Sequence, residues 1–105
     1  MKKIINTPDN LITEMIDGIV GAFPKDFKRV EGFDKTVITS AAPVQNKVGI
    51  ATGGGSGHLP LFLGYVGSNL IDGAAVGDVF SSPSADTMLA VTKAIDSGKG
   101  VLYPY

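Results

Sequence analysis

The first strong hydrophobic pattern lies between residues 11 and 23. Apolar side chains recur there about every 3.6 residues, and they are Leu11, Ile12, Met15, Ile16, Ile19, Val20 and Phe23. This spacing predicts an amphipathic helix that starts at Thr7-Pro8-Asp9, with a capping hydroxyl from Thr7, and that ends at Pro24. Apolar helix faces are usually buried, so we assign the stripe to the core or to a subunit interface.

Shorter apolar runs after this helix predict strands. Residues 30–33 and 36–39 are two candidates, separated by Asp34-Lys35. The charged residues 25–29 before them predict a surface turn, with an anion-binding patch as the less favoured alternative. Residues 41–46 predict a loop that carries Pro43. Residues 47–52 predict a buried strand that leads into a run of glycines.

The second half of the chain alternates strand and helix patterns. Residues 73–77 are small and apolar, which predicts a fully buried strand, and residues 78–82 form the loop that leaves it. A helix then begins at Ser82-Pro83 or at Ser84-Ala85-Asp86, and Gly98-Lys99-Gly100 ends it. Residues 101–105 begin a further strand.

Three buried strands separated by helical segments predict a three-layer α/β fold. Such an order implies βαβ crossovers and a mostly parallel sheet, here in one domain over residues 1–105. Ligands of these sheets bind beyond the carboxyl ends of the strands. The glycine run and residues 78–82 both follow strand ends. We therefore expect the two loops to flank one crevice.

The glycine run is Gly53-Gly-Gly-Ser-Gly-His58. An apolar segment, residues 59–66, follows it and predicts a buried helix with Pro60 in its first turn. A glycine-rich turn between a strand and a helix can direct free N–H groups towards a ligand, and glycine permits close approach and positive φ. Gly55, Ser56 and Gly57 are the candidate backbone donors, although a merely tight turn would also use glycine.

Three common glycine motifs do not fit this loop. A Walker A loop ends in Gly-Lys-Ser/Thr, but no lysine lies between Lys47 and Lys93. The dinucleotide motif, started at Gly53, has His58 in place of its third glycine. The nucleophile elbow, started at Gly54, meets the same histidine in place of its last glycine. The sequence therefore favours a small oxygen-rich ligand held by backbone amides beside an imidazole.

Several motifs in combination resemble one known family. The motifs are Met1-Lys-Lys-Ile-Ile-Asn6, Gly53-Gly-Gly-Ser-Gly-His58, Gly64-Tyr-Val-Gly67 and Gly77-Asp-Val-Phe-Ser-Ser-Pro83. Together they resemble the substrate-binding subunits of dihydroxyacetone kinases, the DhaK family. The resemblance runs from end to end of the chain. It implies that residues 1–105 are the N-terminal part of a ketose-binding domain, in a subunit about three times as long.

The resemblance also implies a function. The family phosphorylates dihydroxyacetone or a close short ketose, such as a four-carbon ketose, and a histidine outside this chain holds the ketone covalently. His58 would bind substrate and act in acid–base catalysis, and Gly55, Ser56, Gly57 and Ser82 would contact the ketose. Phosphate would come from Mg-ATP or from a phosphotransferase-system partner, held by a separate nucleotide-binding domain or subunit. No cofactor is therefore expected on this chain.

Other roles remain open for the same residues. From the sequence alone, His58 could be a hydrogen-bonded polar residue without catalytic work, Ser82 a helix cap and Asp78 a cap or turn residue. Two further functions are a non-catalytic, ketose-sensing coactivator of the same fold and an unrelated α/β hydrolase. The incomplete nucleophile motif disfavours the hydrolase.

Composition narrows the possible partners. The net charge of −1 and the lack of a basic cluster beyond residues 25–29 argue against nucleic-acid binding. Without cysteine there is no disulfide or thiolate zinc site, and a single histidine gives no metal ligand set. Only 18% of residues are charged and the mean hydropathy is +0.23, so we expect apolar surface to meet another subunit, as in a homodimer, or the rest of a longer protein.

Targeting signals are not evident in the sequence. The basic start, Met1-Lys2-Lys3, is followed by only two apolar residues before Asn6, which is too short for a signal peptide. No apolar run has the length of a membrane span. We therefore expect a cytoplasmic protein that does not bind membranes.

We predict that residues 1–105 alone lack kinase activity. The family resemblance places a functional aspartate and the covalent histidine outside this stretch, and the stretch has no ATP-binding loop of its own. The purified polypeptide should not phosphorylate dihydroxyacetone when ATP and Mg²⁺ are supplied in a coupled assay. Measurable turnover would contradict this prediction.

Overall fold

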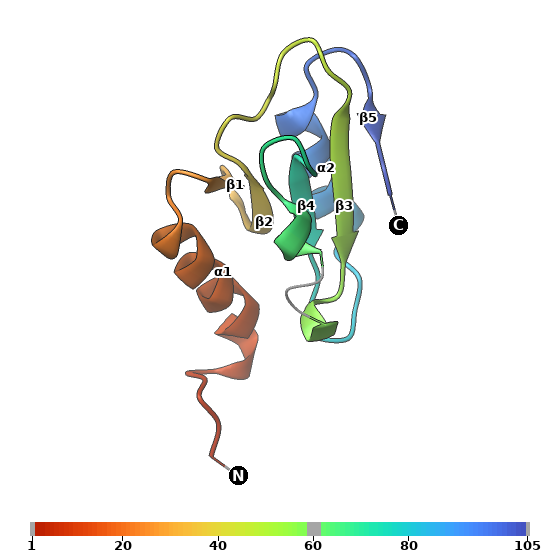
Figure 1. Ribbon diagram of the computed structural model, residues 1–105. Coiled ribbons are helices and arrows are strands. Elements are labelled where there is room, and N and C mark those ends of the chain that lie inside the picture. Colours follow the sequence, from red (N-terminus) through yellow and green to blue (C-terminus); the bar gives the residue numbers. More distant parts are fainter. Residues whose placement is uncertain (1, 59–61, 105) are drawn as a thin grey trace.

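A computed structural model describes residues 2–58 and 62–104 (Figure 1). These residues form a five-stranded sheet with helices packed against it. The main elements in order are α1 (Leu11–Ala22), β1 (Phe27–Val30), β2 (Phe33–Thr39), β3 (Gly49–Gly54), β4 (Gly73–Val76), α2 (Ala85–Ile95) and β5 (Val101–Leu102). No helix in these two ranges combines the length and the apolar character needed to cross a membrane.

The sheet is mixed. Its strand order is β1-β2-β4-β3-β5. Strand β3 runs parallel to β4 and to β5, whereas β2 runs antiparallel to β1 and to β4. The predicted α/β class and the parallel arrangement of the three later strands are confirmed. The antiparallel part comes from the hairpin of β1 and β2, because a short turn can join only antiparallel strands.

Two apolar cores make the structure three-layered. Ile16 of α1 and Val37 belong to the core on one face of the sheet. The next residue, Ile38, belongs to the core on the other face, together with Val91 and Ile95 of α2. Successive side chains of a strand point to opposite faces, so one strand supplies both cores. Figure 1 shows α1 beside the sheet and α2 behind its parallel strands.

Helix α1 follows the predicted stripe closely. It ends at Ala22, directly before Phe23-Pro24, and a 3₁₀ turn (Pro8–Asn10) precedes it. Thr7 has the extended backbone of a capping residue, but its side chain makes no capping hydrogen bond. The expected hydroxyl cap is therefore wrong. The contact is made by main chain instead, because the Asn10 N–H donates to the Thr7 carbonyl over 3.2 Å.

The turn of the N-terminal hairpin lies earlier than predicted. We expected it at Asp34-Lys35, but both residues lie inside β2 and the turn is at Glu31-Gly32. Gly32 has a φ of 82°, a left-handed conformation that glycine adopts without steric cost. Charged residues favour a turn in the sequence, but the start of β2 is exposed and therefore accepts charged side chains within the strand.

Residues 25–29 are only partly a surface turn. Strand β1 begins at Phe27, so Arg29 lies in a strand. Its guanidinium donates to the Thr13 carbonyl over 2.6 Å and pairs with the Asp17 carboxylate, both on α1. The arginine therefore joins β1 to α1.

The helix predicted for residues 59–66 does not form in its described part. Residues 59–61 lie outside the described residues, and Leu63–Tyr65 is a 3₁₀ turn. Val66 then pairs with Ile71 in an isolated bridge. Gly64 lowers the helix preference of this segment by about 1 kcal/mol, while Leu63 and Val66 still reach the core with α1.

The other helix and strand boundaries differ from the predicted ones by a few residues. Strand β3 continues through Gly53 and Gly54, which we had placed in the loop, because both pair with β4. Helix α2 begins after Ser84, whose Oγ accepts a hydrogen bond from the Thr87 N–H over 3.2 Å. This start confirms the second of the two predicted alternatives. The last strand is short, and the predicted end of that strand, Tyr105, lies outside the described residues.

A pair of glycine substitutions tests this packing. A Cβ at Gly73 of β4 would lie 2.8 Å from Ile38 Cγ2 and 2.9 Å from Val91 Cγ1, whereas a Cβ at Gly18 of α1 would meet nothing within 4 Å. Gly73→Ala should lower the free energy of unfolding by about 1–3 kcal/mol through overpacking. Gly18→Ala, the matched control, should raise it by about 0.5–1 kcal/mol. Denaturant unfolding measures both, and equal effects would contradict the packing described.

Candidate functional site

Two loops leave the sheet side by side at the carboxyl ends of β3 and β4. The strands are parallel neighbours, and their last pairs are Gly53 with Ala75 and Gly54 with Val76. The glycine loop follows β3, and the loop of residues 77–84 follows β4. In a parallel sheet this edge is where ligands bind.

Main-chain hydrogen bonds hold the two loops together. The Gly77 N–H donates to the Gly54 carbonyl over 2.8 Å, which extends the sheet by one residue. The Ser56 N–H donates to the Asp78 carbonyl over 2.9 Å. We expected this amide to face a ligand, but it is engaged in the fold. The predicted juxtaposition of the two loops is confirmed, while the supply of backbone donors is smaller than predicted.

The loop glycines make room for other parts of the same chain. A Cβ at Gly55 would lie 3.2 Å from the Ser81 carbonyl oxygen, and a Cβ at Gly57 would collide with the Val79 carbonyl oxygen. A Cβ at Gly54 would collide with the ring of Phe62. Of the two properties that glycine permits, positive φ is not used, because no glycine from 53 to 57 adopts it. Close approach between the loops is the physical reason for glycine here.

A cavity of about 280 Å³ lies between the two loops. Gly55 and Ser82, two of the predicted substrate contacts, both line it. The remaining lining residues are Gly54, Phe62, Val79, Phe80 and Ser81. Sequence reasoning did not single out Phe62, because it was assigned to a helix. Its closeness to Gly54 depends on the tertiary structure, and no local pattern indicates it.

The other predicted site residues lie beside this cavity or cannot be placed in it. Ser56 is buried, with 6% exposure, and its Oγ has no hydrogen-bond partner among the described residues. Gly57 is exposed, and it lies against the Val79 carbonyl oxygen and the ring of Phe80. The backbone of His58 belongs to the 3₁₀ turn Ser56–His58, but its side chain lies outside what the structure describes. The role predicted for His58 is therefore not tested.

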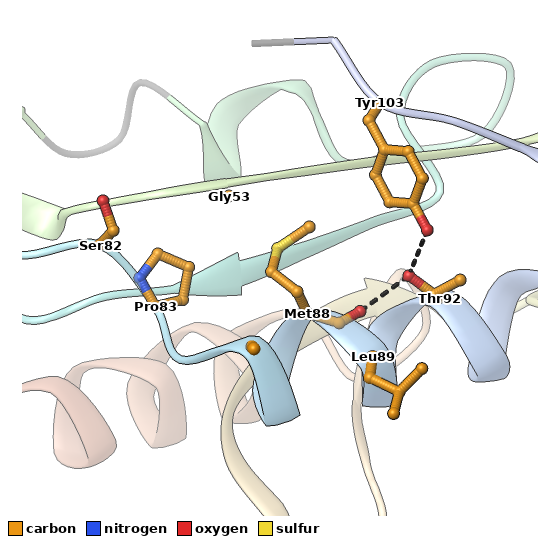
Figure 2. A pocket seen from close by; sticks show the side chains of 8 residues that line it. Gly53, Ser82, Pro83, Met88, Leu89, Thr92 and Tyr103 are labelled. Atoms are coloured by element: carbon orange, nitrogen blue, oxygen red, sulfur yellow. Dashed lines mark hydrogen bonds between the residues drawn. The ribbon is translucent and has the colours of Figure 1, made fainter.

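A larger cavity of about 460 Å³ shares Ser82 with the first one. Figure 2 shows part of its wall, where Met88 and Thr92 of α2 lie on the side towards Gly53 and Tyr103. The Thr92 hydroxyl bonds to the Tyr103 hydroxyl at 2.7 Å and donates to the Met88 carbonyl at 2.8 Å. The hydroxyl groups of Thr92 and Tyr103 in this larger cavity are thus paired with each other. We take the smaller cavity as the candidate site because it unites both predicted loops.

Asp78 anchors the site to strand β2. Its carboxylate accepts a hydrogen bond from Lys35 Nζ over 2.7 Å, while its carbonyl accepts the Ser56 N–H. Both side chains of the ion pair are partly exposed, at 64% for Asp78 and 38% for Lys35, so the pair is worth about 0–1 kcal/mol. A turn role for Asp78, as weighed from the sequence, agrees with this geometry.

Among the described residues, no three or more histidine, cysteine, aspartate and glutamate side chains cluster to hold a metal ion. The Ser56 amide, in the loop that would have to cradle phosphates, is occupied by Asp78.

Known proteins resemble this chain in sequence. A family model described as "Dak1 domain" matches residues 17–105. A Listeria innocua protein named "PTS-dependent dihydroxyacetone kinase 2, dihydroxyacetone-binding subunit DhaK" is 40% identical over 105 residues, which are 100% of this chain and 32% of that protein. A Pectobacterium atrosepticum protein named "L-erythrulose kinase" is 38% identical over 100% of this chain and 17% of its own length.

A solved structure agrees with this resemblance. The dihydroxyacetone kinase from C. freundii, in complex with AMP-PNP and Mg²⁺, superposes with a TM-score of 0.87 at 32% identity, over 97% of this chain and 19% of that one. The chain spans about a third of the length of the Listeria innocua relative. The family match, the identity over the whole chain and the shared fold lead to one conclusion: this chain belongs to the Dak1 domain family and is similar over its length to part of a DhaK subunit.

Proposed function

We propose that this chain supplies part of the ketose-binding site of a dihydroxyacetone kinase. The substrate would be dihydroxyacetone or another short ketose, and the product its phosphate ester. One observation carries the proposal: Gly55 and Ser82, from two loops that follow adjacent parallel strands, line the same small cavity. The names of the Listeria innocua and C. freundii proteins support the same substrate.

The size of the cavity supports a short substrate. About 280 Å³ corresponds to the volume of roughly nine water molecules at about 30 Å³ each. A three-carbon or a four-carbon ketose would fit. The likeness to an L-erythrulose kinase supports the four-carbon ketose as a second candidate substrate.

The chemistry we propose is proton removal from the ketose hydroxyl. His58 would accept this proton as the hydroxyl oxygen forms its bond to phosphorus and the bond from phosphorus to the donor oxygen breaks. Ser82 and the backbone of Gly55 would orient the ketose. In this proposal, as in the family that the sequence resembles, a histidine outside residues 1–105 holds the ketone carbon covalently.

The phosphoryl donor would arrive on a partner. Mg-ATP or a phosphotransferase-system protein would supply it from a separate nucleotide-binding domain or subunit, as the family resemblance implies. Phe80, at the edge of the cavity, is 91% exposed, which supports docking of such a partner beside the site. We also propose a homodimer in the cytoplasm, in which apolar surface of the chain would meet a second subunit.

The role of His58 is tested by His58→Asn in the full-length subunit with its partner. Loss of general-base assistance should lower kcat about 10²–10⁴-fold, while covalent retention of the ketone should leave KM little changed. Steady-state kinetics with dihydroxyacetone measures both constants. A kcat close to that of the parent protein would exclude a catalytic role for His58.

Two serines on either side of Pro83 give a matched test of substrate contact. Ser82 lines the cavity, whereas Ser84 caps α2 through the Thr87 N–H. Ser82→Ala should raise KM for dihydroxyacetone about 5–10-fold, the loss expected for one hydrogen bond, without lowering stability. Ser84→Ala should lower the free energy of unfolding by about 0.5–2 kcal/mol and leave KM unchanged. If the two variants had the same KM, Ser82 would not contact the ketose.

A further inference from the structure

A further cavity, also of about 280 Å³, lies at the end of the sheet opposite the candidate ketose site. Its walls come from the segment between β2 and β3 and from the segment before β4. The polar residues that line it are Thr39, Lys47, Ser68, Asn69 and Asp72. None of them belongs to the two loops of the candidate ketose site.

Asp72 is the acidic residue that lines this cavity. The residue is buried, with 4% exposure, and its Oδ2 accepts hydrogen bonds from Lys47 Nζ at 2.5 Å and from the Ile50 N–H at 2.8 Å. Because both bonds reach the same oxygen, Oδ1 retains its capacity to accept. The Lys47 ammonium retains two further protons that it can donate.

Thr39 contributes a hydroxyl that the fold does not use. The residue is 3% exposed, and its Oγ1 has no hydrogen-bond partner within residues 2–58 and 62–104. Its main chain is fixed, because the Thr39 N–H donates to the Asp72 carbonyl over 2.9 Å. A buried hydroxyl without a partner costs about 1–3 kcal/mol, so a ligand that satisfies it gains that interaction.

The charges in the cavity limit what it can bind. Lys47 and Asp72 neutralise each other, so neither an anion nor a cation meets a net opposite charge. What remains is a set of donors and acceptors: the Thr39 hydroxyl, Asp72 Oδ1, the Lys47 ammonium and the side chains of Ser68 and Asn69. A molecule with several hydroxyl groups both donates and accepts, and it matches this set.

We propose that this cavity binds a small, neutral polyhydroxylated molecule of about the size of glycerol. Its volume, that of roughly nine water molecules, accommodates such a ligand. The two cavities are separated by the length of β3, whose six residues span about 20 Å. The site is therefore distinct from the candidate ketose site, and the inference does not depend on the proposed kinase function.

Glycerol titration of the ¹⁵N-labelled full-length protein tests the inference. We expect saturable shifts of the Thr39, Lys47, Ser68 and Asn69 amides. Thr39→Val keeps the shape of the side chain and removes the hydroxyl, so it should weaken glycerol binding about 5–10-fold, the effect of one hydrogen bond. Thr39→Ser, the matched control, retains the hydroxyl and should bind within about twofold of the parent protein, because the same hydrogen bond is available.

A second variant avoids any dependence on Thr39. Asn69 has a φ of 63°, which glycine also adopts, so Asn69→Gly removes the amide side chain without straining the backbone. It should likewise weaken glycerol binding. The inference is overturned if glycerol shifts only the residues around Gly55 and Ser82, if it gives no saturable shift, or if inorganic phosphate competes for the Thr39 cavity.

Discussion

The parallel pairing of β3 with β4 is the interaction on which the rest of the structure depends. All four residues of β4 are buried, since α1 together with Leu63 and Val66 covers one face of the sheet and α2 the other. The pairing continues past the strands, through the bonds from Gly77 to Gly54 and from Ser56 to Asp78. The sheet that forms the core therefore also fixes the distance between the two loops of the candidate site.

Small residues make this arrangement possible. Gly73 lies in contact range of Ile38 and Val91, so the centre of the sheet has no room for a larger side chain. In the loops, Gly55 and Gly57 lie against the carbonyl groups of residues 78–81 in the same way. The glycine run is thus needed for the fit of one part of the chain against another. The ligand cavity is what remains between the fitted loops.

The sequence by itself determined the elements whose signals are local. The period of the stripe from residue 11 to 23 predicted α1, because every turn of a helix returns its side chains to one face. The run at residues 73–77 predicted β4, because a short, uniformly apolar run is typical of a strand buried on both faces. The motif combination identified the family. The rule that ligands bind at the carboxyl ends of parallel strands brought Gly55 and Ser82 together.

Tertiary structure decided what depends on contacts between distant segments. Local sequence could not show that the Ser56 amide is bound by Asp78, or that Phe62 forms a wall beside Gly54. Leu63 and Val66 have the apolar character of a helix, but packing against α1 and the bridge to Ile71 hold them in a 3₁₀ turn and an extended segment. The Thr39 cavity joins residues from 39 to 72 in sequence. The hydrogen bonds of Asp72 with Thr39, Lys47 and Ile50 join residues that are far apart in sequence. They form only when the sheet assembles, because strand pairing brings these residues together.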